Sequence, residues 1–179
     1  MSNNLLRECW AKSRGLNLCQ LGCEMSGIKR LPDIRQDAAH DCGHAAIRCV
    51  IQYHTPGAVV VVDLSTPQFG MDPAVMESIF RAKLAWNTSC GERTLGELAY
   101  YCADGRPVIC PIQHRGAGHY VVVHAVTSKR VYYHCPVDGA KWAKVGDWLA
   151  AWTDGGRWGE FWRFGLVAWP RAKNNEGTR

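Results

Sequence analysis

The stretch that decides the fold of this chain is Gln36–Val50, which reads QDAAHDCGHAAIRCV. Asp41 is a typical helix N-cap residue and directly precedes Cys42, so the thiol is expected in the first turn of a helix. Free backbone N–H groups and the helix dipole stabilise negative charge there, which predicts a lowered thiol pKa. Cys42 is therefore a candidate nucleophile.

The residues after Cys42 have helical spacing and predict an amphipathic helix that ends before Pro56. The apolar positions of this helix are Ala45, Ala46, Cys49, Val50 and Tyr53. Cys42 lies on the same face, so its sulfur is expected to point towards the body of the protein or into a cleft. The alternative, a core cysteine without chemistry, fits Cys49 well.

Composition limits the class of protein. The chain has 179 residues with 47% hydrophobic content, enough for the core of one domain. A net charge of +5 without a basic and aromatic block argues against nucleic acid as a partner. Nine cysteines, an odd number without a signal sequence, indicate a reducing, cytoplasmic compartment. The longest apolar run, Ala58–Val62, is too short to span a membrane, so we expect a soluble protein.

Helices and strands are expected to be interspersed along residues 31–170, which we treat as the domain. Residues 1–30 are expected to form a lead-in with a short helix, and residues 171–179 a disordered tail. Helices are predicted at 72–86, 94–103 and 145–152, the second with a capping box of Thr94 and Glu97. Strands are predicted at 58–64, 107–112, 119–127, 129–134 and 161–169.

His119 is the candidate base for Cys42, because it opens a predicted strand after a glycine-containing loop in GAGHYVVV. A histidine at the start of a strand can face a helix N-terminus across a cleft. His54, His114 and His124 have no comparable setting and are expected to be ordinary histidines.

A metal site is not expected. His40 precedes the predicted cap and need not share a helical face with Cys42 and His44, and no HExxH motif is present. Three further cysteines, Cys9, Cys19 and Cys23, lack the CxxC spacing of zinc sites. No cofactor is implied either.

Three motifs together resemble the peptidase C39 family, the papain-like cysteine proteases known as bacteriocin-processing leader peptidases. They are Gln36 six residues before Cys42 in DCGxAA, the GHYVVV run at His119, and a strand ending in xPxxG. The resemblance spans about Arg35 to Trp152. It implies an α+β papain-like fold in which a helical part led by the Cys42 helix packs on an antiparallel sheet bearing His119. An extended peptide or protein substrate would bind in the cleft between them.

The same resemblance implies that Cys42 is the nucleophile, His119 the general base and later acid, and Gln36 the oxyanion-hole donor beside the Cys42 N–H. One position departs from the family, whose third catalytic residue is an Asp sixteen residues after the His; here it is Cys135. A neutral thiol cannot stabilise an imidazolium as a carboxylate does. Either Asp138 reaches back to His119, or the Cys–His pair works without a strong third member, or activity is lost.

Two functions follow from these alternatives. The first is a cysteine peptidase that hydrolyses a peptide bond. The second is a catalytically impaired C39-like binding or structural component of a larger assembly, for example a virion-associated component of a phage particle, with its Trp-rich C-terminal third as a contact surface. Family members commonly form the N-terminus of peptide-exporting ABC transporters and cut leaders after Gly-Gly. This sequence shows neither membrane spans nor a P-loop, so we expect a stand-alone relative.

Overall fold

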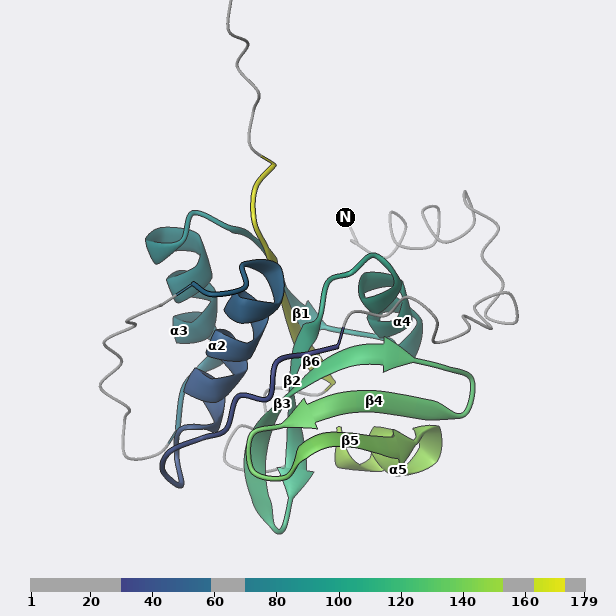
Figure 1. Ribbon diagram of the computed structural model, residues 1–179. Coiled ribbons are helices and arrows are strands. Elements are labelled where there is room, and N and C mark those ends of the chain that lie inside the picture. Colours follow the sequence, from purple (N-terminus) through teal and green to yellow (C-terminus); the bar gives the residue numbers. More distant parts are fainter. Residues whose placement is uncertain (1–29, 59–69, 153–162, 173–179) are drawn as a thin grey trace, which may run out of the picture.

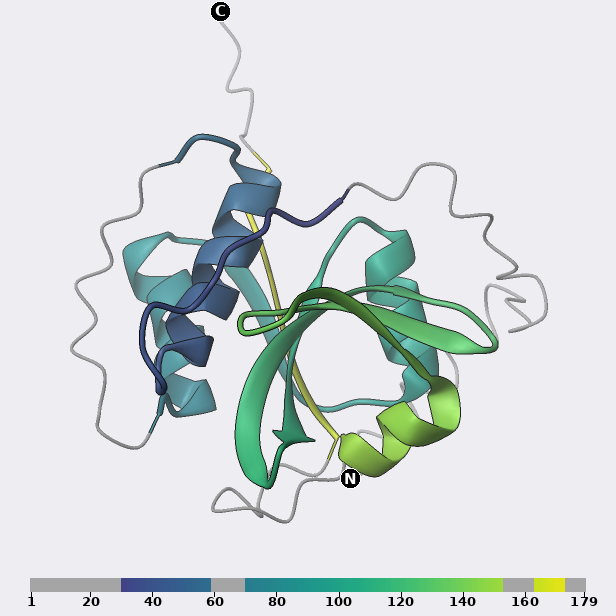
Figure 2. The same ribbon diagram turned by 60° about the horizontal axis from the view of Figure 1, so that its bottom comes forward.

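A six-stranded antiparallel sheet forms the centre of the structure (Figures 1 and 2), a computed structural model that describes residues 30–58, 70–152 and 163–172. In spatial order the strands are β1 (Asn87–Glu92), β6 (Phe164–Trp169), β2 (Val108–His114), β3 (Ala117–Val126), β4 (Arg130–Cys135) and β5 (Gly139–Lys144). The chain that follows β5 returns as β6 to the other half of the sheet, between β1 and β2. The strands β2, β3 and β4 follow one another as hairpins.

Side chains alternate between the two faces of the central strands, which produces two separate apolar cores. On β3, Tyr120 and Val122 belong to one core, and Val121 and Val123 belong to the other. This near-continuous apolar run is typical of a strand that is covered on both faces.

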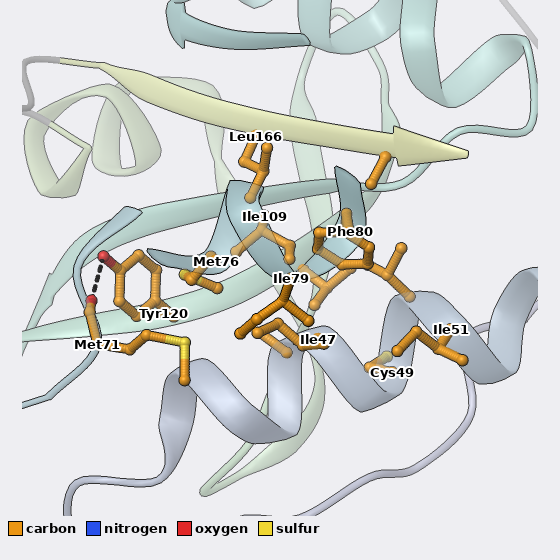
Figure 3. Packing of buried hydrophobic residues seen from close by; sticks show 14 of the residues in the cluster. Ile47, Cys49, Ile51, Met71, Met76, Ile79, Phe80, Ile109, Tyr120 and Leu166 are labelled. Carbon is orange, nitrogen blue, oxygen red and sulfur yellow. Dashed lines mark hydrogen bonds between the residues drawn. The ribbon is translucent and has the colours of Figure 1, made fainter. Parts of the chain in front are cut away.

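The first core lies between the sheet and the helices α2 (Cys42–His54), α3 (Pro73–Ser78) and η1 (Ile79–Lys83). Figure 3 shows Ile47 and Cys49 of α2 packed with residues of α3 and η1 and with Ile109 of β2. The α3 helix begins with Pro73 after Asp72, whose side chain accepts a hydrogen bond from the Ala74 N–H. Cys49 is fully buried, as expected for a core cysteine.

The second core lies on the opposite face, under α4 (Leu95–Ala103) and α5 (Val145–Ala151). Both ribbon views place α2 and α3 on one side of the sheet and α4 and α5 on the other (Figures 1 and 2). The capping box predicted for α4 is present, with Thr94 bonded to the Glu97 N–H and Glu97 to the Thr94 N–H. Trp148 and Trp152 are buried in this core.

The segment that precedes α2 is bound to the end of β4 and the turn after it. His134 Nε2 lies 2.8 Å from the Ile34 carbonyl oxygen, and the Gln36 N–H donates to the Pro136 carbonyl at 3.1 Å. Arg35 donates to the Val137 carbonyl at 2.7 Å. These contacts between residues about one hundred positions apart set Gln36 beside the turn that follows Cys135.

Most predicted elements are confirmed, including the Cys42 helix, the α4 helix, the three hairpin strands and the final strand. The sequence analysis missed β1 and β5, which are the two edge strands of the sheet. Both are short and rich in polar or small residues, and each pairs on one side only, so local propensity does not reveal them. The predicted lead-in helix, residues 59–64 of the strand predicted over 58–64, and most of the tail lie outside the described residues. None of the described helices is long and apolar enough to cross a membrane.

Candidate active site

Cys42 is the first residue of α2, and the start of this helix is packed closely against β3 and Met71. A Cβ atom on Gly43 would lie 2.9 Å from the Met71 Cβ, so the approach requires glycine. The Tyr120 hydroxyl donates to the Met71 carbonyl at 2.9 Å, a bond drawn in Figure 3 beside the start of α2. The start of α2, and with it Cys42, is therefore held by the close contact of Gly43 with Met71 and by the hydrogen bond that joins Met71 to Tyr120 of β3.

The predicted side-chain cap of this helix is wrong. Asp41 precedes α2 with φ −91° and ψ 8°, outside the extended conformation of a capping residue, and its side chain makes no cap hydrogen bond. Its carboxylate instead lies 3.6 Å from His44 Nδ1. The helix begins where predicted, but tertiary packing fixes its start.

The expectation of a lowered Cys42 pKa is also wrong, because burial raises the pKa of the thiol. The residue is 8% exposed, and loss of hydration outweighs the backbone N–H groups of Tyr120, Gly43 and Cys42, which favour the thiolate. The Tyr120 N–H places the sulfur beside the peptide bond that joins His119 to Tyr120. Pairing between β3 and β4 begins only at Val122, so β4 does not cover this part of the β3 edge.

His119 lies on β3 opposite Ile112 and is buried. Its Nε2 is 3.3 Å from the Cys135 sulfur, and its ring centroid is 5.1 Å from that of His114. Burial lowers the pKa of His119 to about 4, with a further lowering by His114. At neutral pH the Cys42 thiol and the His119 imidazole are therefore both uncharged.

Cys135, the last residue of β4, contacts the His119 ring. Its side chain is buried, and its sulfur accepts a hydrogen bond from the Asp138 N–H at 3.4 Å. With Nε2 of His119 turned towards this sulfur, Nδ1 is the ring nitrogen left for proton transfer. A proton on Nε2 directed at Cys135 gives the tautomer in which Nδ1 is an acceptor.

Asp138 lies close to this group but bonds elsewhere. Its carboxylate is 3.3 Å from Arg115 Nη2 and 3.8 Å from both Lys141 Nζ and His114 Nε2. Within the described residues no hydrogen bond or ion pair joins Asp138 to His119. Its charge acts on His119 only at a distance, by opposing the lowering of the His119 pKa.

The Gln36 side chain is held over the loop that leads to Cys42. Its Nε2 donates to the Ala38 carbonyl at 2.8 Å, which leaves the second amide hydrogen for another acceptor. Its Oε1 is buried and has no hydrogen-bond partner. The Gln36 N–H donates to the Pro136 carbonyl, and this hydrogen bond ties the backbone of Gln36 to the turn that follows Cys135.

Sequence reasoning missed His114, which was expected to be an ordinary histidine. The hairpin of β2 and β3 pairs His114 with Ala117, and the turn carries Arg115 at φ 53° and Gly116 at φ 81°. The register of this hairpin brings the His114 and His119 rings near each other, and no strong turn signal in the sequence announces it. Of the described residues, His114, Cys135 and Asp138 also form the one group with metal-ligand atoms within 4.8 Å of one another.

The fold is similar to that of peptidase domains of transporters. One similar structure is a double-glycine-motif protease from an AMS/PCAT transporter in complex with the leader peptide (TM-score 0.59, 18% identity, 82% of this chain and 96% of that one). Another is the peptidase domain of Streptococcus ComA, a bi-functional ABC transporter involved in a quorum-sensing pathway (TM-score 0.63, 17% identity, 79% of this chain and 100% of that one). The expected papain-like α+β fold is thus confirmed. No protein-family model and no curated protein sequence matches the chain.

Proposed function

We propose that this protein is a cysteine peptidase in which Cys42 is the nucleophile, His119 the general base and Gln36 an oxyanion donor. The observation that carries the proposal is the packing of the α2 N-terminus against β3. The Tyr120 N–H favours the Cys42 thiolate, and Tyr120 is the residue that follows His119 on β3. The Cys135 sulfur lies 3.3 Å from Nε2 of His119, which supports Nδ1 as the nitrogen that accepts the proton.

The reaction begins from an uncharged pair, because burial raises the Cys42 pKa and lowers the His119 pKa. As the sulfur attacks the peptide carbonyl, the thiol proton passes to Nδ1 of His119 and the carbonyl oxygen becomes negative. The Gln36 amide and the Cys42 N–H donate to that oxygen. When the intermediate collapses, the C–N bond breaks and the imidazolium protonates the leaving amine. Water, deprotonated by His119, then hydrolyses the thioester.

The substrate class that the fold supports is an extended peptide. One structural neighbour is a double-glycine-motif protease with a bound leader peptide, so we take a peptide that ends in Gly-Gly at the cleavage site as the first candidate. In the proposed complex the scissile carbonyl of the peptide lies at the Cys42 sulfur, with Gln36 as the donor to its oxygen and His119 as the base.

A peptide aldehyde tests this proposal because a working site binds the peptide part and stabilises the hemithioacetal that the aldehyde forms with the nucleophilic thiol. We expect a tetrapeptide aldehyde ending in Gly-Gly, labelled with carbon-13 at the aldehyde carbon, to form a covalent adduct with the wild-type chain, detected by the carbon-13 NMR signal of the hemithioacetal. The adduct should be absent in Cys42→Ala and strongly reduced in His119→Ala. Cys90→Ser is the matched control, since Cys90 is exposed on β1, and it should behave as wild type. An adduct that survives Cys42→Ala would refute the assignment.

The second candidate function is a binding component of a larger assembly without peptidase activity. Cys135 in place of a carboxylate favours it, as does the exposed ring of Trp142 on β5, which is 50% exposed and stacks with Arg130 at 4.0 Å. Aromatic and arginine side chains are common anchors of protein interfaces. If aldehydes ending in Gly-Gly, Leu or Arg all fail to label Cys42 in a chain that melts cooperatively, this second function replaces the first.

A further inference from the structure

The geometry points to a zinc site beside the candidate active site, formed by His114, Cys135 and Asp138 and completed by Nε2 of His119. The nitrogen, sulfur and oxygen ligand atoms of the first three residues all lie within 4.8 Å of one another. His119 joins this group through the 3.3 Å contact between its Nε2 and the Cys135 sulfur. The residue that departs from the C39 pattern is thus the one thiol of the group.

The distances fit tetrahedral zinc. Zinc binds sulfur at about 2.3 Å and imidazole nitrogen at about 2.0 Å, which separates two such ligand atoms by roughly 3.5 Å across a tetrahedral angle. The contact from His119 Nε2 to the Cys135 sulfur is already 3.3 Å, and that from His114 Nε2 to the Asp138 carboxylate is 3.8 Å. His119 lies outside the group of three whose ligand atoms are all within 4.8 Å of one another, so its ring would have to turn towards the ion to complete the site.

An unsatisfied polar atom gives independent support. His114 Nε2 is buried and has no hydrogen-bond partner, because the Asp138 carboxylate at 3.8 Å is too distant for a hydrogen bond. A buried ring nitrogen without a partner costs free energy, and a metal ion would remove that cost. The Asp138 N–H that donates to the Cys135 sulfur would stabilise the bound thiolate, as hydrogen bonds around metal ligands commonly do.

Two cations lie near the site and must be accommodated. Arg115 and Lys141 both pair with the Asp138 carboxylate, at 3.3 Å and 3.8 Å. Their side chains are 71% and 46% exposed, so both can turn into solvent when the carboxylate binds a metal. Cys135 loses its proton to the solvent on binding, so the ion meets one thiolate and one carboxylate.

Zinc at this site would inhibit the peptidase, a consequence that rests on the proposed function. A metal bound through the Nε2 lone pair of His119 leaves the ring proton on Nδ1. Nδ1 then cannot accept the proton of Cys42. Zinc would thus act on the base and leave the nucleophile unligated, which distinguishes it from an ion bound directly to Cys42.

Cobalt reports directly on the ligands. We expect one equivalent of Co²⁺ added to the reduced full chain to give visible bands of tetrahedral cobalt and a near-ultraviolet thiolate charge-transfer band. Cys135→Ser should remove one bound equivalent and its charge-transfer band, and His114→Gln should weaken binding roughly tenfold or more, as loss of a metal-site contact does. Cys90→Ser and Cys42→Ala should keep both signals. An unchanged spectrum in Cys135→Ser overturns the site.

Inhibition is tested separately. Zinc should block aldehyde labelling of Cys42 in wild type and fail to do so in His114→Gln, whose side chain is partly exposed and whose melting in chelator checks that it folds. Equal inhibition of both would refute control through this site. If the metal-free wild-type chain is not labelled by the aldehyde, the proposed peptidase function is refuted, but a cobalt signal would still support the metal site. If the chain is labelled but gives no cobalt signal, only the zinc site is refuted.

Discussion

Nε2 of His119 lies 3.3 Å from the sulfur of Cys135, and Cys135 is 1% exposed. A buried thiol therefore contacts the ring nitrogen for which the C39 resemblance predicts a carboxylate partner. The sulfur contacts the imidazole, but a thiol is a weaker hydrogen-bond acceptor than a carboxylate. Burial then lowers the His119 pKa to about 4, which makes His119 a weak base.

Replacing this sulfur by a carboxylate should strengthen the base. We expect Cys135→Asp, measured in chelator, to raise kcat/KM on a Gly-Gly peptide by on the order of tenfold or more, because the carboxylate stabilises the imidazolium formed during attack. Cys135→Asn, which orients the ring without a charge, is the matched control and should give a smaller gain. No gain in a variant that melts like wild type would show that the base does not limit the rate.

Gln36 should matter for turnover and not for the intrinsic reactivity of the thiol. Gln36→Ala is expected to lower kcat on the order of a hundredfold, the usual effect of losing one oxyanion donor. Alkylation of Cys42 by iodoacetamide, which forms no oxyanion, should be unchanged. Gln52→Ala, at the far end of α2, is the control and should keep wild-type kcat. Parallel losses of kcat and alkylation would mean that Gln36 only maintains the loop before Cys42.

The pH dependence of Cys42 alkylation tests whether the pair is neutral at rest. The Cys42 pKa is raised above its usual value and the His119 pKa is about 4, so no thiolate–imidazolium pair should exist between pH 5 and 8. The alkylation rate should therefore rise about tenfold per pH unit in that range, in proportion to the thiolate. The site of alkylation is followed by peptide mass mapping. A rate that stays level from pH 5 to 8 would indicate a preformed ion pair.

Gly43 should be intolerant of a side chain. A Cβ at this position would lie 2.9 Å from the Met71 Cβ, so Gly43→Ala is expected to destabilise the fold by about 1–3 kcal/mol, the usual cost of overpacking. Denaturant unfolding at neutral pH measures the change. Gly146→Ala in α5, where nothing lies within 4 Å, is the control and should be neutral or stabilising. A Gly43→Ala variant as stable as wild type would show that the start of α2 can shift.

Local sequence patterns predicted the central elements of the fold because those elements carry strong signals. The stripe from Cys42 to Tyr53, the box of Thr94 and Glu97, and the apolar run at Val121 each specify their element without distant partners. The edge strands β1 and β5 escaped prediction, since pairing with β6 and β4 forms them. Propensity is weakest where one neighbouring strand decides the structure.

The sequence by itself determined the helix that carries Cys42, the strand that carries His119 and the substitution at Cys135, because periodicity and motif spacing are local. Only the tertiary structure decided how these groups behave. Burial reversed the predicted direction of the Cys42 pKa, since the loss of hydration exceeded the stabilisation by backbone N–H groups. The hairpin and the β4–β5 turn brought His114, Cys135 and Asp138 together, and that juxtaposition depends on strand register across the sheet.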